Sequence, residues 1–289
     1  TTLDPGVKVA DLDAELRALV FEYLEGCMKS SPELRRIFER LVEDAPKSLR
    51  VKEVFETVEA FKQVAWFVTV AQKLRPIDSL YDLACGHGLL GVLLAYRFPK
   101  KQVVCVDLEQ RDGFHAFVRA FEAHGESRDP SSQTRDVLGN LSFVQGDLQE
   151  TVQNGCVTSK SLLVAVHACH EASRAVVEGA RAIGAAWGVM PCCIRDGIYL
   201  TCGVKGAKAP GNDDDLRHAV MCGAVGATYG VERLNCIDRR ITNRNIFLFG
   251  GVGFGSREAY LRSCDGPARG TLGGGAPGGG APGGGAPGG

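Results

Sequence analysis

Several marks of large protein classes are absent from this chain of 289 residues. Its 33 lysines and arginines nearly balance 34 acidic residues, so the net charge of −1 gives no global attraction to nucleic acid or anionic membranes. No apolar run reaches the roughly 20 residues that a membrane-spanning helix needs, and we expect no membrane contact. None of the 11 cysteines belongs to a Cys-x-x-Cys pair, which argues against a zinc ribbon or a disulfide scaffold. We therefore expect an intracellular, reducing compartment, which includes a chloroplast or a mitochondrion.

A glycine-rich turn after a strand-like segment is the most informative feature that is present. The apolar segment 79–84 leads into Gly86 and Gly88, and an apolar helix is expected from Leu89. Glycines let the backbone turn sharply and approach a ligand closely. The start of the helix presents free N–H groups to whatever lies in the turn. This arrangement predicts one half of a nucleoside-binding site; a glycine-rich turn without a ligand is the alternative.

Two carboxylates bear on which cofactor the turn would hold. Asp107 ends the next β-branched segment, 102–107, and it can accept both ribose hydroxyls. Asp82 lies four residues before Gly86, where it would face the pyrophosphate of a dinucleotide, an unfavourable contact. In a methyltransferase the same carboxylate lies near the methionine end of S-adenosyl-L-methionine, where it suits the ammonium and the sulfonium. The charges therefore favour S-adenosyl-L-methionine over a nicotinamide dinucleotide.

The pattern Asp-x-Ala-x-Gly-x-Gly at 82–88 resembles motif I of class I S-adenosylmethionine-dependent methyltransferases. In that family an acid after the second strand holds the ribose, which Asp107 matches. The segment 143–147 resembles the end of the third strand, where Asp147 would read the adenine amino group. Ala84 stands where glycine is commoner. The candidate cofactor-binding residues are Asp82, Ala84, Cys85, Gly86, Gly88, Asp107, Asp147 and Leu148.

Alternating strand and helix patterns over residues 77–264 predict an α/β methyltransferase domain with a doubly wound sheet. Its last two strands, 231–237 and 245–250, must be antiparallel, because the connection between them is too short for a parallel crossover. Together with the resemblance, this predicts a Rossmann-like seven-stranded sheet, mostly parallel, with an antiparallel C-terminal strand.

Segments at both ends differ from this domain. Residues 1–76 read as helices and form an N-terminal helical cap. The first of these helices has an apolar face at three-to-four spacing, formed by Leu12, Leu16, Leu19, Tyr23 and Cys27. Residues 265–289 repeat Gly-Gly-Gly-Ala-Pro and form a flexible tail to which we assign no chemistry.

Acid–base residues crowd the end of the expected fourth strand, 161–166. His167, His170 and Glu171 follow it, at the edge where a methyl acceptor arrives in the class I fold. A histidine can remove the proton of a hydroxyl acceptor, so these three residues are the candidate catalytic residues. In the alternative interpretation, Glu171 caps the next helix and one histidine is a hydrogen-bonded core residue.

The turns after the fourth and fifth strands carry a finer resemblance. A His-x-Cys-type turn at 167–169 and Pro-Cys-Cys at 191–193 resemble a branch of methyltransferases that includes the Trm13-type tRNA 2′-O-methyltransferases and the methyltransferase-like 25 group. Neighbouring Cys192 and Cys193 side chains would diverge on an extended strand, so we expect small buried cysteines and no metal site.

Four arginines surround the final hairpin: Arg233, Arg239, Arg240 and Arg244. They either contact RNA phosphates or lie paired with acids on a solvated surface. The sequence thus predicts methyl transfer to an unidentified acceptor, with RNA favoured weakly through the resemblance. The alternative is a non-catalytic subunit that keeps the fold and binds within a larger assembly.

Overall fold

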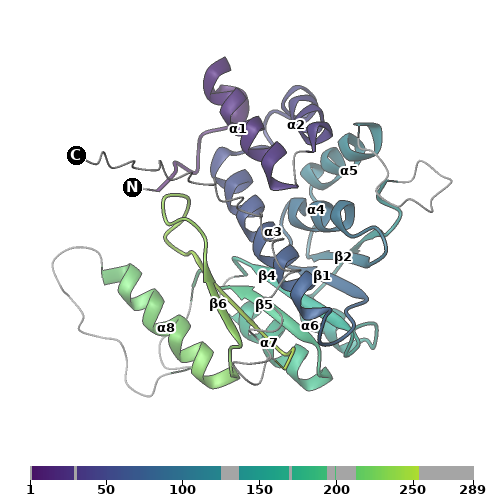
Figure 1. Cartoon of the computed structure of the whole chain (residues 1–289), viewed down its shortest axis with the longest axis vertical. Helices are drawn as coiled ribbons and strands as arrows, with labels where there is room; N and C mark the ends of the chain where they lie inside the picture. The colour runs from purple at the N-terminus through teal and green to yellow at the C-terminus, as the bar shows by residue number, and fades with distance from the viewer. Residues whose placement is uncertain are drawn as a thin grey trace, which may run out of the picture.

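Seven strands form a sheet in the order β3-β2-β1-β4-β5-β7-β6. Figure 1 shows β1, β2, β4, β5 and β6 of this sheet. The structure is a computed structural model, and it describes residues 2–28, 31–124, 137–168, 171–193, 199 and 213–253. The strands are β1 (Ser79–Leu83), β2 (Gln102–Asp107), β3 (Leu141–Gln145), β4 (Ser161–Val166), β5 (Ala186–Met190), β6 (Arg233–Cys236) and β7 (Ile246–Gly250). The first five are parallel, and β7 runs antiparallel to both of its neighbours. The Rossmann-like methyltransferase sheet is therefore confirmed, with the antiparallel strand at the predicted end of the domain.

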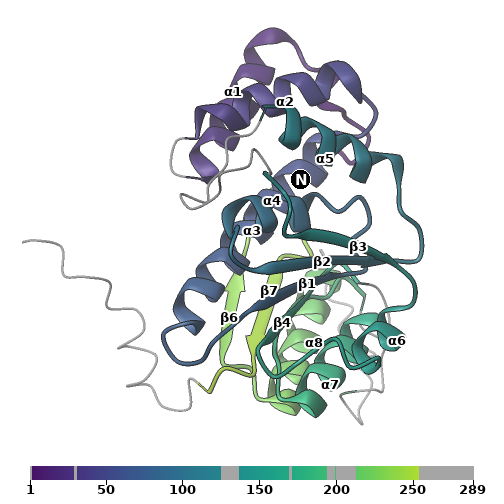
Figure 2. The same cartoon turned by 90° about the vertical axis from the view of Figure 1, so that its right-hand side faces the viewer.

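Helices cover both faces of this sheet (Figure 2). Their bounds are α3 (Val51–Ala71), α4 (Leu89–Arg97), α5 (Asp112–His124), α6 (Leu148–Gln153), α7 (Glu171–Ile183) and α8 (Asp213–Tyr229). Alternate strand residues face opposite sides. Leu80 and Val103 belong to the core that includes α3, α4 and α5, whereas Tyr81 and Val104 belong to the core that includes α7 and α8.

Two further helices, α1 (Ala14–Cys27) and α2 (Pro32–Asp44), form an outer layer beside α5 (Figure 2). A short 3₁₀ turn, Val9–Asp11, precedes them. The apolar face predicted for α1 is only partly buried, because Leu16 is 49% and Leu19 56% exposed. The buried stripe of α1 consists of Val20, Phe21 and Leu24 instead.

The parallel pairing of the strands determines where the candidate site lies. Asp82 lies opposite Cys105 of β2 and Val164 of β4, so the carboxyl ends of these three strands share one edge. Ligands bind outside the carboxyl ends of such strands, where neighbouring connections diverge. The predicted tail, 265–289, lies outside the described residues, and the boundary predicted between cap and catalytic domain stays a prediction. None of the described helices combines the length and apolar character needed to cross a bilayer.

Candidate active site

The loop after β1 has the backbone that its glycines predict. Gly86 and Gly88 have φ angles of 59° and 73°, in the left-handed region. A Cβ added to Gly88 would lie 2.5 Å from the Phe114 ring, so a side chain has no room there. Gly88 is also the N-cap of α4, whose first N–H groups point toward the loop. The backbone thus makes an open cradle at the start of α4.

Ala84 also has a left-handed backbone, with φ 55°. This conformation costs an L-residue on the order of 1–2 kcal/mol, and a glycine would avoid that cost. Its neighbour Cys85 holds the loop to the adjacent strand, because its N–H donates to the carbonyl of Val106 over 3.1 Å. The substitution of alanine for the commoner glycine is therefore strained, although the methyl group fits.

Asp107 joins the loop to the ends of two other strands. Its Oδ2 accepts a hydrogen bond from the Gly86 N–H at 2.7 Å, and its carbonyl accepts one from Gly146 at 2.9 Å. The carboxylate is half-buried at the end of β2. The structure thus brings the predicted ribose acid to the glycine loop.

Asp82 is only 2% exposed and lies beneath the same loop. Its Oδ2 accepts a hydrogen bond from the Gly91 N–H in α4 at 3.0 Å. Burial raises the pKa of Asp82 to about 7; the Gly91 N–H opposes this rise and the charge of Asp107 adds to it. A buried carboxylate of this kind gains from a nearby positive charge, which is what a sulfonium or an ammonium would supply.

Asp147 and Leu148 lie at the end of β3. Asp147 caps α6, because its Oδ1 accepts from the N–H groups of Gln149 at 2.7 Å and Glu150 at 3.3 Å. Leu148 is half-buried against the core below α7. Their role toward adenine stays a prediction, and neither residue lines the cavity described next.

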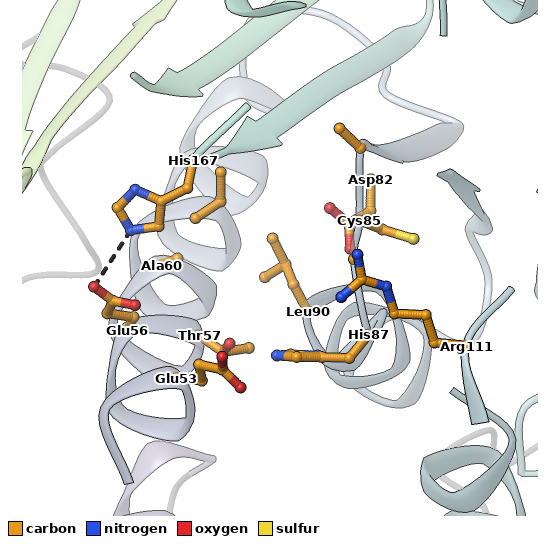
Figure 3. A pocket seen from close by; sticks show the side chains of 13 residues that line it. Glu53, Glu56, Thr57, Ala60, Asp82, Cys85, His87, Leu90, Arg111 and His167 are labelled. Carbon is orange, nitrogen blue, oxygen red and sulfur yellow. Dashed lines mark ion pairs between the residues drawn. The ribbon is translucent and has the colours of Figure 1, made fainter. Parts of the chain in front are cut away.

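A cavity of about 300 Å³ opens between the glycine loop and α3 (Figure 3). Its walls come from α3, the end of β1, the β1–α4 loop, the start of α4, the segment after β2 and the end of β4. The polar and charged lining residues are Glu53, Glu56, Thr57, Asp82, His87, Arg111 and His167. Charges of both signs therefore face one small space beside motif I.

His167 is the predicted catalytic residue that the structure places in this cavity. Its Nε2 lies 3.4 Å from Oε1 of Glu56 on α3 (Figure 3). Its backbone is left-handed, with φ 54°, directly after β4. The Cys192 thiol donates to the His167 carbonyl over 3.6 Å, so the turns after β4 and β5 contact each other.

The other two predicted catalytic residues are not brought to the cavity. His170 lies outside the described residues. Glu171 begins α7, where its side chain is 43% exposed and lies 3.6 Å from Arg174 in the same helix. This placement fits the helix-start interpretation of Glu171, while a contact with substrate stays a prediction.

Several residues that line the cavity do not lie at strand ends, so the sequence pattern did not predict them. Glu53, Glu56 and Thr57 come from a helix that the sequence assigns to the cap. His87 was within reach, because it lies between the two motif glycines. Burial lowers the pKa of His87, and its Nδ1 accepts from the Leu89 N–H at 3.1 Å, so its Nε2 carries the proton of the neutral ring.

The final hairpin is not a free basic surface at the three arginines whose contacts are described. Arg239 pairs with Asp215 at 2.7 Å, and Arg240 pairs with Asp238. Arg233 lies over the Trp66 ring, 4.0 Å from its centroid. The charge-paired interpretation of these arginines therefore agrees with the structure better than phosphate contact.

One group of metal-type side chains stands out among the described residues. The ligand atoms of Asp82, Cys85 and Cys105 lie within 4.8 Å of one another. The contact with Cys85, together with burial, raises the pKa of the Cys105 thiol well above its ordinary value. Because zinc needs thiolates and four ligands, we assign no metal to this group.

Comparison with known families decides the fold family. Residues 47–196, more than half of the chain, match a family model described as a methyltransferase domain. The chain belongs to this methyltransferase-domain family. The matched range includes α3, which lines the cavity, and membership supports S-adenosyl-L-methionine as the cofactor. The narrower branch suggested by the Pro-Cys-Cys turn stays a prediction.

Individual relatives are distant. A glutathione S-transferase C-terminal domain-containing protein from Xenopus laevis is 27% identical over 119 residues, which cover 41% of this chain and 16% of that protein. The chain thus spans a small part of that relative. An O-methyltransferase family protein from Burkholderia thailandensis is 17% identical, with a TM-score of 0.37 over 82% of this chain and 69% of that chain. A 16S rRNA (adenine(1408)-N(1))-methyltransferase from Catenulisporales acidiphilia is 18% identical, with a TM-score of 0.35 over 64% and 87%.

Proposed function

We propose that this protein transfers a methyl group from S-adenosyl-L-methionine to an acceptor that enters the cavity between the glycine loop and α3. One observation carries the proposal: the cavity places a buried acid, Asp82, the motif I loop and a histidine, His167, around one space. Neither a structural glycine turn nor a core histidine accounts for this combination.

The residues present fit the cofactor. The cradle at Gly88 excludes side chains, and Asp82 is a buried acid whose hydrogen bond comes from a single backbone N–H in the described contacts. In the proposal, Asp107 holds the ribose hydroxyls, and Asp147 with Leu148 contacts the adenine. When bound, the cofactor supplies an electrophilic methyl group on a sulfonium. The protein's own contribution is alignment of the acceptor, with His167 as the candidate base.

RNA is the first acceptor class to test. Its support is the resemblance of the turns after β4 and β5 to tRNA methyltransferases; the paired arginines of the hairpin add nothing to it. The proposal also includes a reducing, intracellular compartment, where Cys85 and Cys105, close together beside the cofactor loop, would stay thiols.

A second candidate function is a binding subunit of a larger assembly, and one surface favours it. An apolar groove of about 430 Å³ lies between α1, α3 and the N-terminal segment. Its lining includes the half-exposed Leu16 and Leu19, together with Tyr23 and Phe55. Exposed apolar grooves of this kind are frequent at protein contacts.

Calorimetry with S-adenosyl-L-methionine and with NAD tests the cofactor. We expect binding of the methyl donor, and Asp107→Ala should weaken it by about 1–3 kcal/mol, because the ribose hydroxyls lose their acceptor. Asp78→Asn is the matched control, since Asp78 is exposed before β1, at the opposite end of that strand, and pairs with Lys160. Binding of NAD alone, or unchanged affinity in Asp107→Ala, would contradict the assignment.

Activity is tested with radiolabelled methyl donor offered to total RNA, protein extract and metabolites. Label in the RNA fraction supports the proposed acceptor, and label in another fraction identifies a different one. Cofactor binding without label in any fraction favours the binding subunit.

A further inference from the structure

Glu56 is the most buried acid of α3 that faces the cavity, with 9% of its surface exposed. Its carboxylate lies near groups from three elements. Nε2 of His167, after β4, lies 3.4 Å from Oε1 of Glu56 (Figure 3). Nζ of Lys52 on α3 lies 3.7 Å from the same oxygen, and the Thr242 hydroxyl of the β6–β7 loop also acts on the carboxylate. Glu56 therefore connects the helix before the sheet with two loops at its carboxyl edge.

The charge of Glu56 determines which atom of the contact donates. Burial alone would raise the pKa of Glu56. The contact with His167, the charge of Lys52 and the Thr242 hydroxyl lower it by more, so the net pKa lies below its ordinary value. Glu56 is thus a carboxylate at neutral pH and can only accept. A proton on Nε2 of His167 makes this 3.4 Å contact attractive, whereas a lone pair there would face the carboxylate. In the neutral ring, Nδ1 then holds the lone pair and is the basic nitrogen.

The backbone of His167 supports a functional interpretation of this contact. A left-handed residue other than glycine persists only where its surroundings hold it. The His167 N–H donates to the Met190 carbonyl over 2.9 Å, and the Cys192 thiol donates to the His167 carbonyl. The strained residue is held by its main chain, while its ring is directed by a buried charge from a different element.

We propose that Glu56 is the positioning residue of His167, whose ring it holds in the tautomer with the proton on Nε2. The consequence rests on the proposed function: Glu56 fixes the orientation of the His167 ring at the wall of the cavity that the acceptor would enter. This arrangement follows the general logic of a histidine base that is oriented by an acid.

The ring proton of His167 tests the proposal directly. In protein labelled with ¹⁵N-histidine, the ring of His167 should carry its proton on Nε2. The signal of this ring is assigned by its loss in His167→Asn. In Glu56→Met, which keeps the length but removes the acceptor, that signal should change and both tautomers should be populated. In Glu56→Gln, which keeps an uncharged acceptor, the preference for Nε2 should weaken and remain.

Glu53→Met is the matched control. Glu53 lies on the same helix, lines the same cavity and carries the same charge, but it pairs with Arg50 at 3.1 Å and acts on His87. Its loss should change the His87 signal and leave that of His167. A His167 signal that stays unchanged in Glu56→Met, or that Glu53→Met changes equally, overturns the proposal.

Two further measurements separate a failure to fold and a failure of the proposed function from a failure of this proposal. If thermal melting shows that Glu56→Met is unfolded, the decision passes to Glu56→Gln, where an unchanged His167 signal overturns the proposal. Calorimetry of the wild-type protein with S-adenosyl-L-methionine tests the proposed function independently, because a protein that binds no cofactor could still show the Nε2 proton.

Discussion

Two residues directly after neighbouring parallel strands share the same unusual backbone. Ala84 follows β1 and has φ 55°, and His167 follows β4 and has φ 54°. At Ala84 the side chain is only a methyl group. The contacts of this loop are made by nearby main-chain groups, such as the Gly86 N–H, which donates to Asp107. At His167 the side chain itself is directed by Glu56. The first position is thus a strained substitute for glycine, whereas the second uses strain to present a ring.

This contrast divides the active edge into two regions. Under the proposed function, the first is a cofactor region, which consists of the ends of β1, β2 and β3 and depends on close backbone packing. The second is an acceptor region, which consists of the ends of β4 and β5 with α3 and depends on side chains from distant parts of the chain. The two regions should therefore respond differently to substitution.

The largest effect should come from closing the space in the cofactor region. A Cβ on Gly91 would lie 2.2 Å from the buried Cys105 sulfur and 3.4 Å from Asp82 Oδ2. We expect Gly91→Ala to lower the free energy of unfolding by about 3 kcal/mol, because neither neighbour can move aside. Denaturant titration measures this change.

Two variants show whether crowding is the cause. The double variant Gly91→Ala/Cys105→Ala removes the sulfur and should recover part of the loss. Gly223→Ala, in an exposed turn of α8 with nothing within 4 Å of the added Cβ, should be neutral or stabilising. A stable Gly91→Ala protein would show that the cofactor region tolerates side chains after all.

The second effect concerns the buried acid. The pKa of Asp82 is about 7 in the folded protein against an ordinary value of 3.8, so the folded state binds the extra proton between these limits. Stability without cofactor should therefore fall as pH rises from about 4 to about 7 and then level off. We expect Asp82→Asn to flatten this part of the profile and to stabilise the protein at pH 8 by on the order of 2 kcal/mol, since unpaired amide protons offset part of the gain.

The affinity for the cofactor should depend on pH in the opposite direction to stability. A positively charged ligand favours ionised Asp82, so the affinity for S-adenosyl-L-methionine should rise between pH 6 and pH 8, with proton release on binding at the lower pH. Asp82→Asn should bind more weakly and with little pH dependence. Calorimetry in two buffers of different ionisation enthalpy measures the protons released. A pH-independent affinity in the wild-type protein would contradict the role of Asp82.

The two regions also differ in how far the sequence could predict them. The number and direction of the strands, the glycine loop, Asp82 and Asp107 follow from a contiguous motif, from alternation and from the resemblance. The structure places them accordingly. The strand bounds shift by one or two residues at the ends of β1, β6 and β7.

The acceptor region was harder because its residues are not neighbours in the sequence. Glu56 precedes His167 by more than a hundred positions, and a glutamate on an amphipathic helix carries no mark of the partner it will meet. For the same reason, the spacing of Leu16 and Leu19 predicted an apolar face but not what would cover it. Periodicity identifies a helix face, whereas tertiary packing decides its burial.

The smallest effect sharpens the comparison between the two left-handed residues. Ala84→Gly removes the strain of the left-handed backbone, and the greater freedom of glycine in the unfolded chain offsets part of the gain, so we expect stabilisation by about 0.5–1 kcal/mol. His167→Gly relieves the same backbone strain but loses the contact with Glu56, and it should show no net gain. Thermal melting of both variants, in parallel, measures the difference.

Gly155→Ala provides the opposite control, because Gly155 is left-handed at φ 83° with open space around it, and an alanine there should cost about 1 kcal/mol. If Ala84→Gly destabilises the protein, the methyl group contributes packing that outweighs its backbone strain. Equal gains in stability in Ala84→Gly and His167→Gly would show that the His167 ring does not stabilise the fold. The distinction between the two regions would then rest on cofactor and acceptor binding alone.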